Sequence, residues 1–307
     1  MKAFEHVARS VRAFGRELAR GTGLGPQEPP AFGLALGGGF ARGIAHIGVL
    51  KVLEEAKIPL SFVAGTSVGA LIGAAYCSGL SAAELEQVAF QVRSHHISRW
   101  TFSKLGLASN QRMAVFLHRI LKQKNFDDLK IPLAICATDF RTGEGVAFRS
   151  GPLIDAVRAS CAYPGMFLPV EVDGRLLVDG MLSYPVPSVP LRKMGARRVL
   201  SIHLKSGYNN AGPRHVFDVI GQSFSIALEH NARVWRGASD LVVEPDVTPF
   251  EYDAFARAGE MIRAGEVAMR KALPQVQSWF ATEKPERPAR PAARHTVVAV
   301  TPEVEVP

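Results

Sequence analysis

Apolar and polar positions near the start of the chain follow two patterns, and each pattern predicts a different element. The apolar run at residues 32–36 stops at three glycines, which is how a buried strand ends in a sharp turn. From residue 44 to 55, apolar residues recur mostly at helical spacing with charged residues on the other side, so a helix leaves the glycine loop. The apolar run at 60–64 predicts a second buried strand, and the small residues at 68–76 predict a helix directly after it.

Further strand-like runs are separated by helical stretches along the whole chain. The runs begin at Phe32, Leu60, Ile131, Gly145, Leu176, Val199 and Leu241. Strands that alternate with helices are typical of an α/β fold, so we expect a three-layer sandwich with a mostly parallel central sheet. Residues 82–123 have a helical pattern throughout, and no long internal repeat is visible.

Ser67 lies between the second predicted strand and the helix that follows it, in the sequence GTSVG at residues 65–69. A serine hydroxyl is a poor nucleophile at neutral pH, so a catalytic serine is presented on a tight turn beside a base and oxyanion donors. Gly65 and Gly69 flank Ser67 and remove Cβ atoms where the strand and helix backbones approach each other. The order strand, serine, helix therefore indicates a nucleophile elbow.

The glycine-rich loop GGGFARG at residues 37–43 presents backbone N–H groups at a helix N-terminus, where anions are attracted. A dinucleotide-binding fingerprint fails in both registers, because a residue other than glycine falls where a glycine is required. A P-loop fails because no Lys-Ser or Lys-Thr pair closes the loop. We therefore expect an oxyanion hole made by the N–H groups of Gly37, Gly38 and Gly39, with a purely structural turn as the alternative.

These motifs resemble those of the patatin-like phospholipases, a family with a glycine-rich oxyanion loop, a G-x-S-x-G elbow and an Asp-Gly dipeptide. The resemblance runs from about Phe32 to about Leu191 and is most detailed over residues 34–55. Three further stretches match in order: ATDFRTGE at 137–144, SCAYPGMFLPV at 160–170 and VDGMLSYPVP at 178–187. The resemblance implies a patatin-like fold and a serine acylhydrolase.

The resemblance also implies a Ser–Asp dyad, in which Asp179 takes the proton from Ser67 directly and Gly180 completes the Asp-Gly motif. Asp179 follows an alternating segment typical of a strand, so we expect its carboxylate at the same sheet edge as the elbow. Asp139 and Asp173 are the other candidates for the base.

Histidines downstream of the elbow keep a conventional hydrolase triad open as an alternative. A triad runs Ser, then Asp or Glu, then His along the chain. His203, His215 and His230 lie suitably downstream, and His203 ranks first because it follows a buried-looking strand. We expect His46 to be a packed or capping residue. No metal-ligand spacing emerges, so we expect neither a metal nor another cofactor.

Arg42 and Gly43 end the glycine loop. The Arg42 guanidinium either pins the loop through hydrogen bonds or binds a substrate phosphate, and we favour the pin. Three positions depart from the family pattern: Phe40 replaces a common fourth glycine, Met181 a glycine or alanine, and Tyr184 an asparagine. We expect the Phe40 side chain to shape the acyl entrance.

Composition bears on the compartment and the partners. The chain has 307 residues, 47% of them hydrophobic, which is enough for one large core, and its three cysteines do not suggest a disulfide framework. The sequence has neither a run of 18 apolar residues nor a signal-type segment, so we expect a cytoplasmic protein. The net charge is +8, but no basic stripe interleaved with aromatic residues indicates nucleic-acid binding.

The first 20 residues place apolar side chains within about an 80° arc of a helix, opposite four arginines. This predicts a basic amphipathic helix on an anionic membrane surface at the inner face, with docking on a protein as the alternative. The expected organisation is this helix at 1–20, a linker at 21–31, a patatin-like catalytic core at 32–192, the C-terminal part of the same domain at 193–283 and a disordered Pro/Arg-rich tail at 284–307.

The expected activity is that of a phospholipase- or lysophospholipase-type acylhydrolase, which cleaves a phospholipid or other fatty-acyl ester through an acyl-enzyme. An acyltransferase or thioesterase with the same dyad is one alternative. A weakly active lipid-binding regulatory module is another. Head group, acyl-chain length and oligomeric state stay open.

Overall fold

The computed structural model of the protein describes residues 31–92, 99–103, 105–205, 212 and 216–281. The predicted helix at 1–20, the linker at 21–31 except its last residue, and the tail at 284–307 lie outside these residues. The strands are β1 (Phe32–Leu36), β2 (Phe62–Thr66), β3 (Arg99–Ser103), β4 (Gly106–Ser109), β5 (Leu133–Asp139), β6 (Gly145–Phe148), β7 (Gly165–Phe167), β8 (Val170–Val172), β9 (Arg175–Asp179), β10 (Arg198–Ile202) and β11 (Leu241–Val243). The α-helices are α2 (Ala45–Glu55), α3 (Val68–Cys77), α4 (Ala82–Gln91), α6 (Gln111–Ile120), α7 (Leu153–Ser160), α8 (Ser188–Lys193), α9 (Val216–His230), α10 (Arg233–Gly237) and α11 (Ala258–Ser278). Short 3-10 helices are η1 (Phe40–Ile44), η2 (Phe126–Asp128), η3 (Gly180–Leu182) and η4 (Phe255–Arg257).

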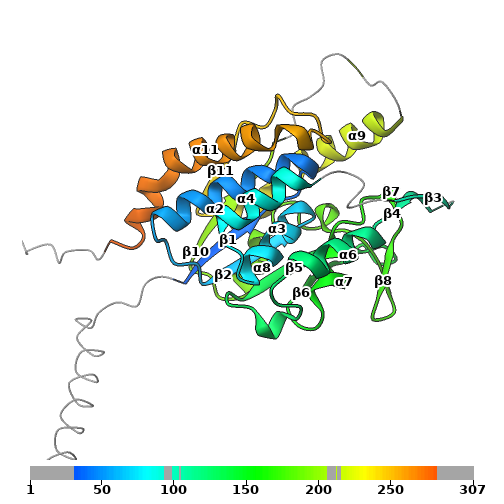
Figure 1. Ribbon diagram of the computed structural model, residues 1–307, viewed down its shortest axis with the longest axis horizontal. Helices are drawn as coiled ribbons and strands as arrows, with labels where there is room; N and C mark the ends of the chain where they lie inside the picture. The colour runs from blue at the N-terminus through cyan, green and yellow to red at the C-terminus, as the bar shows by residue number, and fades with distance from the viewer. Residues whose placement is uncertain (1–30, 93–98, 104, 206–211, 213–215, 282–307) are drawn as a thin grey trace, which may run out of the picture. The chain divides into compact units, whose positions relative to one another are not determined.

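A central sheet organises the fold (Figure 1), with the strand order β11-β10-β1-β2-β5-β9-β8 and with β6 paired to β5. The strands from β11 to β5 run parallel to one another. β6 and β9 each pair antiparallel with β5, and β8 pairs antiparallel with β9. All seven strand runs predicted from the sequence belong to this sheet. The predicted α/β architecture with a mostly parallel sheet is confirmed.

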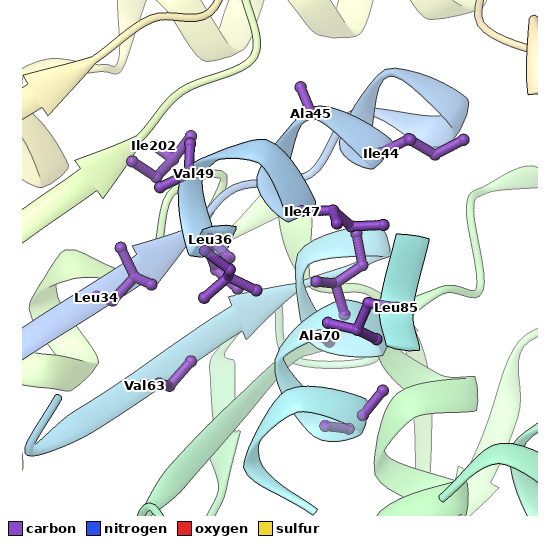
Figure 2. Packing of buried hydrophobic residues seen from close by; sticks show 14 of the residues in the cluster. Leu34, Leu36, Ile44, Ala45, Ile47, Val49, Val63, Ala70, Leu85 and Ile202 are labelled. Atoms are coloured by element: carbon purple, nitrogen blue, oxygen red, sulfur yellow. The ribbon is translucent and has the colours of Figure 1, made fainter. Parts of the chain in front are cut away.

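Helices cover both faces of the sheet, because successive side chains of a strand point to opposite sides. Leu34 and Leu36 belong to the larger core, which β1, β2 and β10 share with α2, α3, α4 and α11. Figure 2 shows side chains of this core from these strands and from α2, α3 and α4. Ala35 belongs to the smaller core on the other face, with side chains of α8 and α10. Three layers result, as predicted.

The prediction of helix throughout residues 82–123 is wrong in its middle. Between α4 and α6, β3 and β4 form a hairpin that pairs with β7 in a second, three-stranded sheet. The approach is close, because a Cβ at Gly106 would lie 2.8 Å from the carbonyl carbon of Phe167. Local periodicity does not reveal such pairing with a distant strand.

α2 and α11 lie side by side at very short range (Figure 1). A Cβ at Gly48 of α2 would overlap the carbonyl oxygen of Ile262 in α11. On the other helix, a Cβ at Gly265 would overlap the carbonyl oxygen of Ala45. The two backbones therefore touch at a pair of glycines, which fixes α2, the helix that leaves the glycine loop, against α11.

The Gly48→Ala protein should be less stable, because the added methyl group forces the two helix backbones apart. We expect its free energy of unfolding to fall by about 2 kcal/mol or more, measured by denaturant unfolding. Gly237→Ala is the matched control, since Gly237 also lies in a helix but has nothing within 4 Å of its Cβ position. That variant should keep or slightly exceed wild-type stability. A Gly48→Ala protein as stable as the control would contradict the close crossing.

Candidate active site

Ser67 occupies the tight turn between β2 and α3, as predicted. Its φ of 54° and ψ of −124° are unusual for a residue other than glycine, so the turn is strained. The backbones meet closely on both sides of it. A Cβ at Gly65 would overlap the backbone of α3, and a Cβ at Gly69 would overlap the carbonyl oxygen of Leu36. Glycine is therefore required at both positions. The close approach of the backbones keeps the turn that carries Ser67 tight.

The Ser67 hydroxyl donates a hydrogen bond of 2.7 Å to Oδ2 of Asp179, the last residue of β9. The other carboxylate oxygen accepts the N–H of Met181 at 2.9 Å. Gly180 lies between Asp179 and Met181 in the sequence and packs against β5. A Cβ at Gly180 would overlap the carbonyl oxygen of Cys136. The structure thus brings the two predicted residues together in a geometry that permits direct proton transfer.

The Asp179 side chain is buried, and the residue is only 1% exposed. Burial raises the pKa of its carboxyl to about 7, because apolar surroundings disfavour the ionised form. The hydrogen bonds from Met181 and Ser67 lower this pKa, but they offset only part of the rise that burial causes. A carboxyl with a pKa near neutrality can both accept and return a proton at physiological pH.

Asp139 and Asp173, the other candidates for the base, both serve turns, Asp139 as the last residue of β5 before a turn and Asp173 within one. Asp139 Oδ1 accepts the N–H groups of Arg141 at 2.9 Å and Thr142 at 3.2 Å. Asp173 and Gly174 have φ values of 50° and 73° and form the two-residue turn between β8 and β9. The geometry therefore favours Asp179 among the three.

Ser160, the last residue of α7, holds the elbow in place. Its Oγ accepts the Ser67 N–H at 2.8 Å and donates to the Cys136 carbonyl at 2.5 Å. The residue is fully buried. Nothing in the local pattern predicts this role, although Ser160 begins one of the stretches that resemble the family. Thr138 acts similarly on Asp179, because its hydroxyl donates a hydrogen bond of 2.9 Å to the Asp179 backbone carbonyl.

The glycine loop lies beside the elbow, and a Cβ at Gly38 would stand 3.6 Å from Ser67 Cβ. The N–H groups of Gly37 and Gly38 already donate to the carbonyls of Ile202 and Pro185, each at 3.1 Å. The prediction that these two N–H groups face a substrate oxygen is therefore corrected, because each has a backbone acceptor.

Two other N–H groups, those of Gly39 and Val68, lie near the elbow. Val68 is the first residue of α3, so its N–H has no acceptor within the helix. In the part of the chain that the structure describes, neither the Val68 N–H nor the Gly39 N–H donates to a protein acceptor. Of the three predicted donors, only the Gly39 N–H has no acceptor among the described residues.

Arg42 ties the loop to a distant segment. Its Nε donates to the Phe250 carbonyl at 2.9 Å, and the N–H of Ala41 donates to the Tyr252 carbonyl at 3.0 Å. Gly43 packs against α3, where a Cβ would overlap a side chain. These contacts agree with Arg42 as a pin for the loop.

Ser67 lines a cleft with a volume of about 420 Å³. One wall is aromatic, because the Phe40 ring lies 4.8 Å from that of Tyr163 and 5.9 Å from that of Tyr252. The Tyr163 ring lies 5.9 Å from that of Phe224 in α9, and two methionines pack on the same cluster. The cleft therefore presents an apolar surface next to Ser67.

His203, the first candidate for a triad histidine, has other partners. Its Nδ1 lies 2.9 Å from Glu244 Oε1, and its ring centroid lies 5.0 Å from that of Trp235. It follows β10, so β1 and the glycine loop lie between it and Ser67. His203 lines the same cleft, but the Ser67 hydroxyl donates to Asp179.

The remaining histidines and cysteines do not enlarge the site. His215 lies outside the described residues, and His230 is exposed at the end of α9. The three cysteines are buried and free. Over the described ranges, no three His, Cys, Asp or Glu side chains gather as a metal site. No helix in the described part of the chain is both long enough and apolar enough to cross a bilayer.

Comparisons with known proteins bear on the family of the chain. A family model described as patatin-like phospholipase matches residues 34–191. An uncharacterized NTE family protein of Mycobacterium tuberculosis is 35% identical over 192 residues, covering 60% of this chain and 51% of that protein. The lysophospholipase NTE1 of Mycosarcoma maydis is 29% identical over 228 residues, covering 71% of this chain and 12% of that protein.

The crystal structure of VipD from Legionella pneumophila matches with a TM-score of 0.49 and 14% sequence identity. The match covers 81% of this chain and 67% of that chain. Against the curated relatives, the chain spans about half the length of the mycobacterial protein and a much smaller share of the fungal one.

The buried carboxyl predicts a pH-dependent stability. Its pKa is raised from 3.8 to about 7, so between these values folded Asp179 keeps a proton that the unfolded chain releases. Relative to Asp179→Asn, which cannot ionise, the wild type should lose free energy of unfolding as pH rises through this window. Urea unfolding of both proteins between about pH 4.5 and 8 measures the difference. Parallel curves would contradict the raised pKa.

Proposed function

The chain belongs to the patatin-like phospholipase family, and on this premise we propose that it is a serine acylhydrolase acting on phospholipids or lysophospholipids. The observation that carries the proposal is the direct hydrogen bond of 2.7 Å from the Ser67 hydroxyl to the buried Asp179 carboxylate. It supports a dyad, because the base touches the nucleophile without a residue between them. A similar fungal protein is named a lysophospholipase, which supports a lipid ester as substrate.

In the proposed reaction, Ser67 Oγ attacks the acyl carbonyl carbon while its proton passes to Asp179 Oδ2. The carbonyl oxygen becomes an oxyanion, which accepts hydrogen bonds from the N–H groups of Gly39 and Val68. Asp179 then gives the proton to the departing glycerol oxygen, and Ser67 is left acylated. A water molecule gives a proton to Asp179 as it attacks the acyl-enzyme, and the fatty acid leaves while Ser67 regains its proton.

The aromatic wall of the cleft is the proposed acyl site. Phe40 adopts a left-handed φ of 52°, and its ring contacts those of Tyr163 and Tyr252. Many members of the family have glycine at this position, so the ring narrows the cleft where they have no side chain. Phe40 therefore limits the acyl chain that fits beside Ser67.

Acyl transfer to an acceptor other than water, and cleavage of a thioester, would pass through the same acyl-enzyme. Product analysis with a competing alcohol separates hydrolysis from transfer. A cytoplasmic location and contact with a membrane surface through residues 1–20 are part of the proposal that rests on the sequence alone.

A fluorophosphonate probe should label the wild-type protein on Ser67, as measured by intact mass. Ser67→Ala should abolish labelling, and Asp179→Asn should slow it by about 100-fold or more, because the base is lost. The wild-type labelling rate should rise with pH through about 7, where Asp179 loses its proton. His203→Ala is the control and should label at nearly the wild-type rate.

Two outcomes of this experiment would change the proposal. Loss of labelling in folded His203→Ala would indicate a triad that includes His203. Absence of labelling in folded wild-type protein would contradict the hydrolase and favour the lipid-binding module.

Phe40→Ala should shift the acyl-chain preference toward longer esters, because removal of the ring widens the acyl site. We expect the ratio of kcat/KM for a long-chain nitrophenyl ester to that for a short-chain ester to rise roughly tenfold. Phe140→Ala, at an exposed aromatic residue in a turn after β5, is the matched control. An unchanged ratio in Phe40→Ala would place the acyl chain elsewhere in the cleft.

A further inference from the structure

His46, in the first turn of α2, is buried and reaches the glycine loop. Its Nε2 lies 2.8 Å from the carbonyl oxygen of Gly37. A carbonyl only accepts hydrogen bonds, so Nε2 carries the proton and donates. Burial lowers the pKa of this imidazole to about 4, so the ring is neutral at physiological pH.

The hydrogen bond from His46 holds one end of the peptide group that joins Gly37 to Gly38. The N–H at the other end of this planar group donates to the Pro185 carbonyl at 3.1 Å. Glycines leave the backbone on either side free to rotate, so these two anchors fix the plane of the peptide. This fixed plane is the reference from which the φ and ψ of Gly38 set the direction of the Gly39 N–H.

The donor itself is held rigidly. His46 lies two residues before Gly48, where the backbone of α2 touches that of α11. α2 therefore cannot slide or turn without breaking this contact. The position of the imidazole, and through it the Gly37 carbonyl, is set by the packing of two helices.

The other ring nitrogen of His46 makes no hydrogen bond among the described residues, so the contact from Nε2 to Gly37 is the polar contact of the buried ring there. His46 Nδ1 is buried, and no hydrogen-bond partner for it exists in the described residues. An unpaired buried polar atom is unfavourable for folding. The imidazole thus retains one unsatisfied nitrogen while the other donates to the loop.

We propose that His46 is a positioning residue of the oxyanion loop, whose Nε2–H orients the Gly37–Gly38 peptide so that the Gly39 N–H faces the reacting carbonyl. This inference rests on the proposed acylhydrolase function. His46 does not touch the substrate, and it acts through the peptide that it holds. Its effect therefore falls on the transition state more than on substrate binding.

The test compares two amides that differ only in reach. In His46→Gln the side-chain amide can place an N–H where Nε2 stands, whereas the amide in His46→Asn is shorter, and His46→Leu has no donor. We expect kcat for a short-chain ester to fall about 10- to 100-fold in His46→Leu and His46→Asn, with KM within about twofold of wild type. His46→Gln should recover most of kcat. His118→Leu, at a histidine of α6, controls for loss of an unrelated imidazole.

Thermal unfolding checks that each variant is folded, and if His46→Leu does not fold, the Gln and Asn variants decide. Wild-type kcat in folded His46→Asn, or a Gln variant as slow as the Asn variant, would overturn the positioning role. A rise in KM at unchanged kcat would overturn it as well. Failure of the proposed function gives a different result, because wild type and Ser67→Ala would then show equal hydrolysis and labelling.

Discussion

The ionisable carboxyl of Asp179, enclosed in an apolar interior, is the constraint on which the rest of the site depends. A buried carboxylate is unfavourable unless hydrogen bonds compensate for the lost water, and here the Ser67 hydroxyl and the Met181 N–H supply two. The compensation is incomplete, as its pKa of about 7 indicates. A fully compensated carboxylate would be a weaker base. Incomplete solvation therefore suits this carboxylate to its proposed role, which is to take a proton from Ser67.

Strand register places the Asp179 carboxylate beside Ser67. Thr66 pairs with Cys136 and Asp179 pairs with Ala137, so Asp179 stands level with Ser67 across β5. β9 begins after the tight turn at Asp173 and runs antiparallel to β5. It ends at Asp179, level with Ser67. A slip of one residue would turn the Asp179 side chain to the other face of the sheet. The Thr138 hydroxyl, bonded to the Asp179 carbonyl, holds the strand end at this register.

The parts of the site that are visible in the sequence are those encoded by neighbouring residues. The apolar run before Gly37, and the serine between Gly65 and Gly69, define strand ends and turns locally, and the structure has them there. The glycine donors could not be assigned in this way, because the acceptors of two of them are backbone carbonyls far along the chain, which carry no side-chain signature. The hairpin of β3 and β4 could not be predicted for the same reason, because the strand that pairs with it, β7, lies far along the chain. Asp179 was found through resemblance to a family, since an Asp-Gly dipeptide alone is a common turn.

The glycine loop depends on chain that lies beyond the region matched by the family. That match ends at residue 191, yet the Ile202, Phe250 and Tyr252 carbonyls all accept hydrogen bonds from the loop. α11 lies beyond it too, and its contact with α2 fixes the imidazole that holds the Gly37 carbonyl. Two proteins with the same glycine motif can therefore aim their N–H groups differently, according to the segments that follow the matched region. Within the motif, the Gly38 N–H donates to the Pro185 carbonyl inside the matched region, and the Gly37 N–H donates to the Ile202 carbonyl beyond it. The elements after the matched region therefore decide whether the Gly37 N–H has a backbone acceptor.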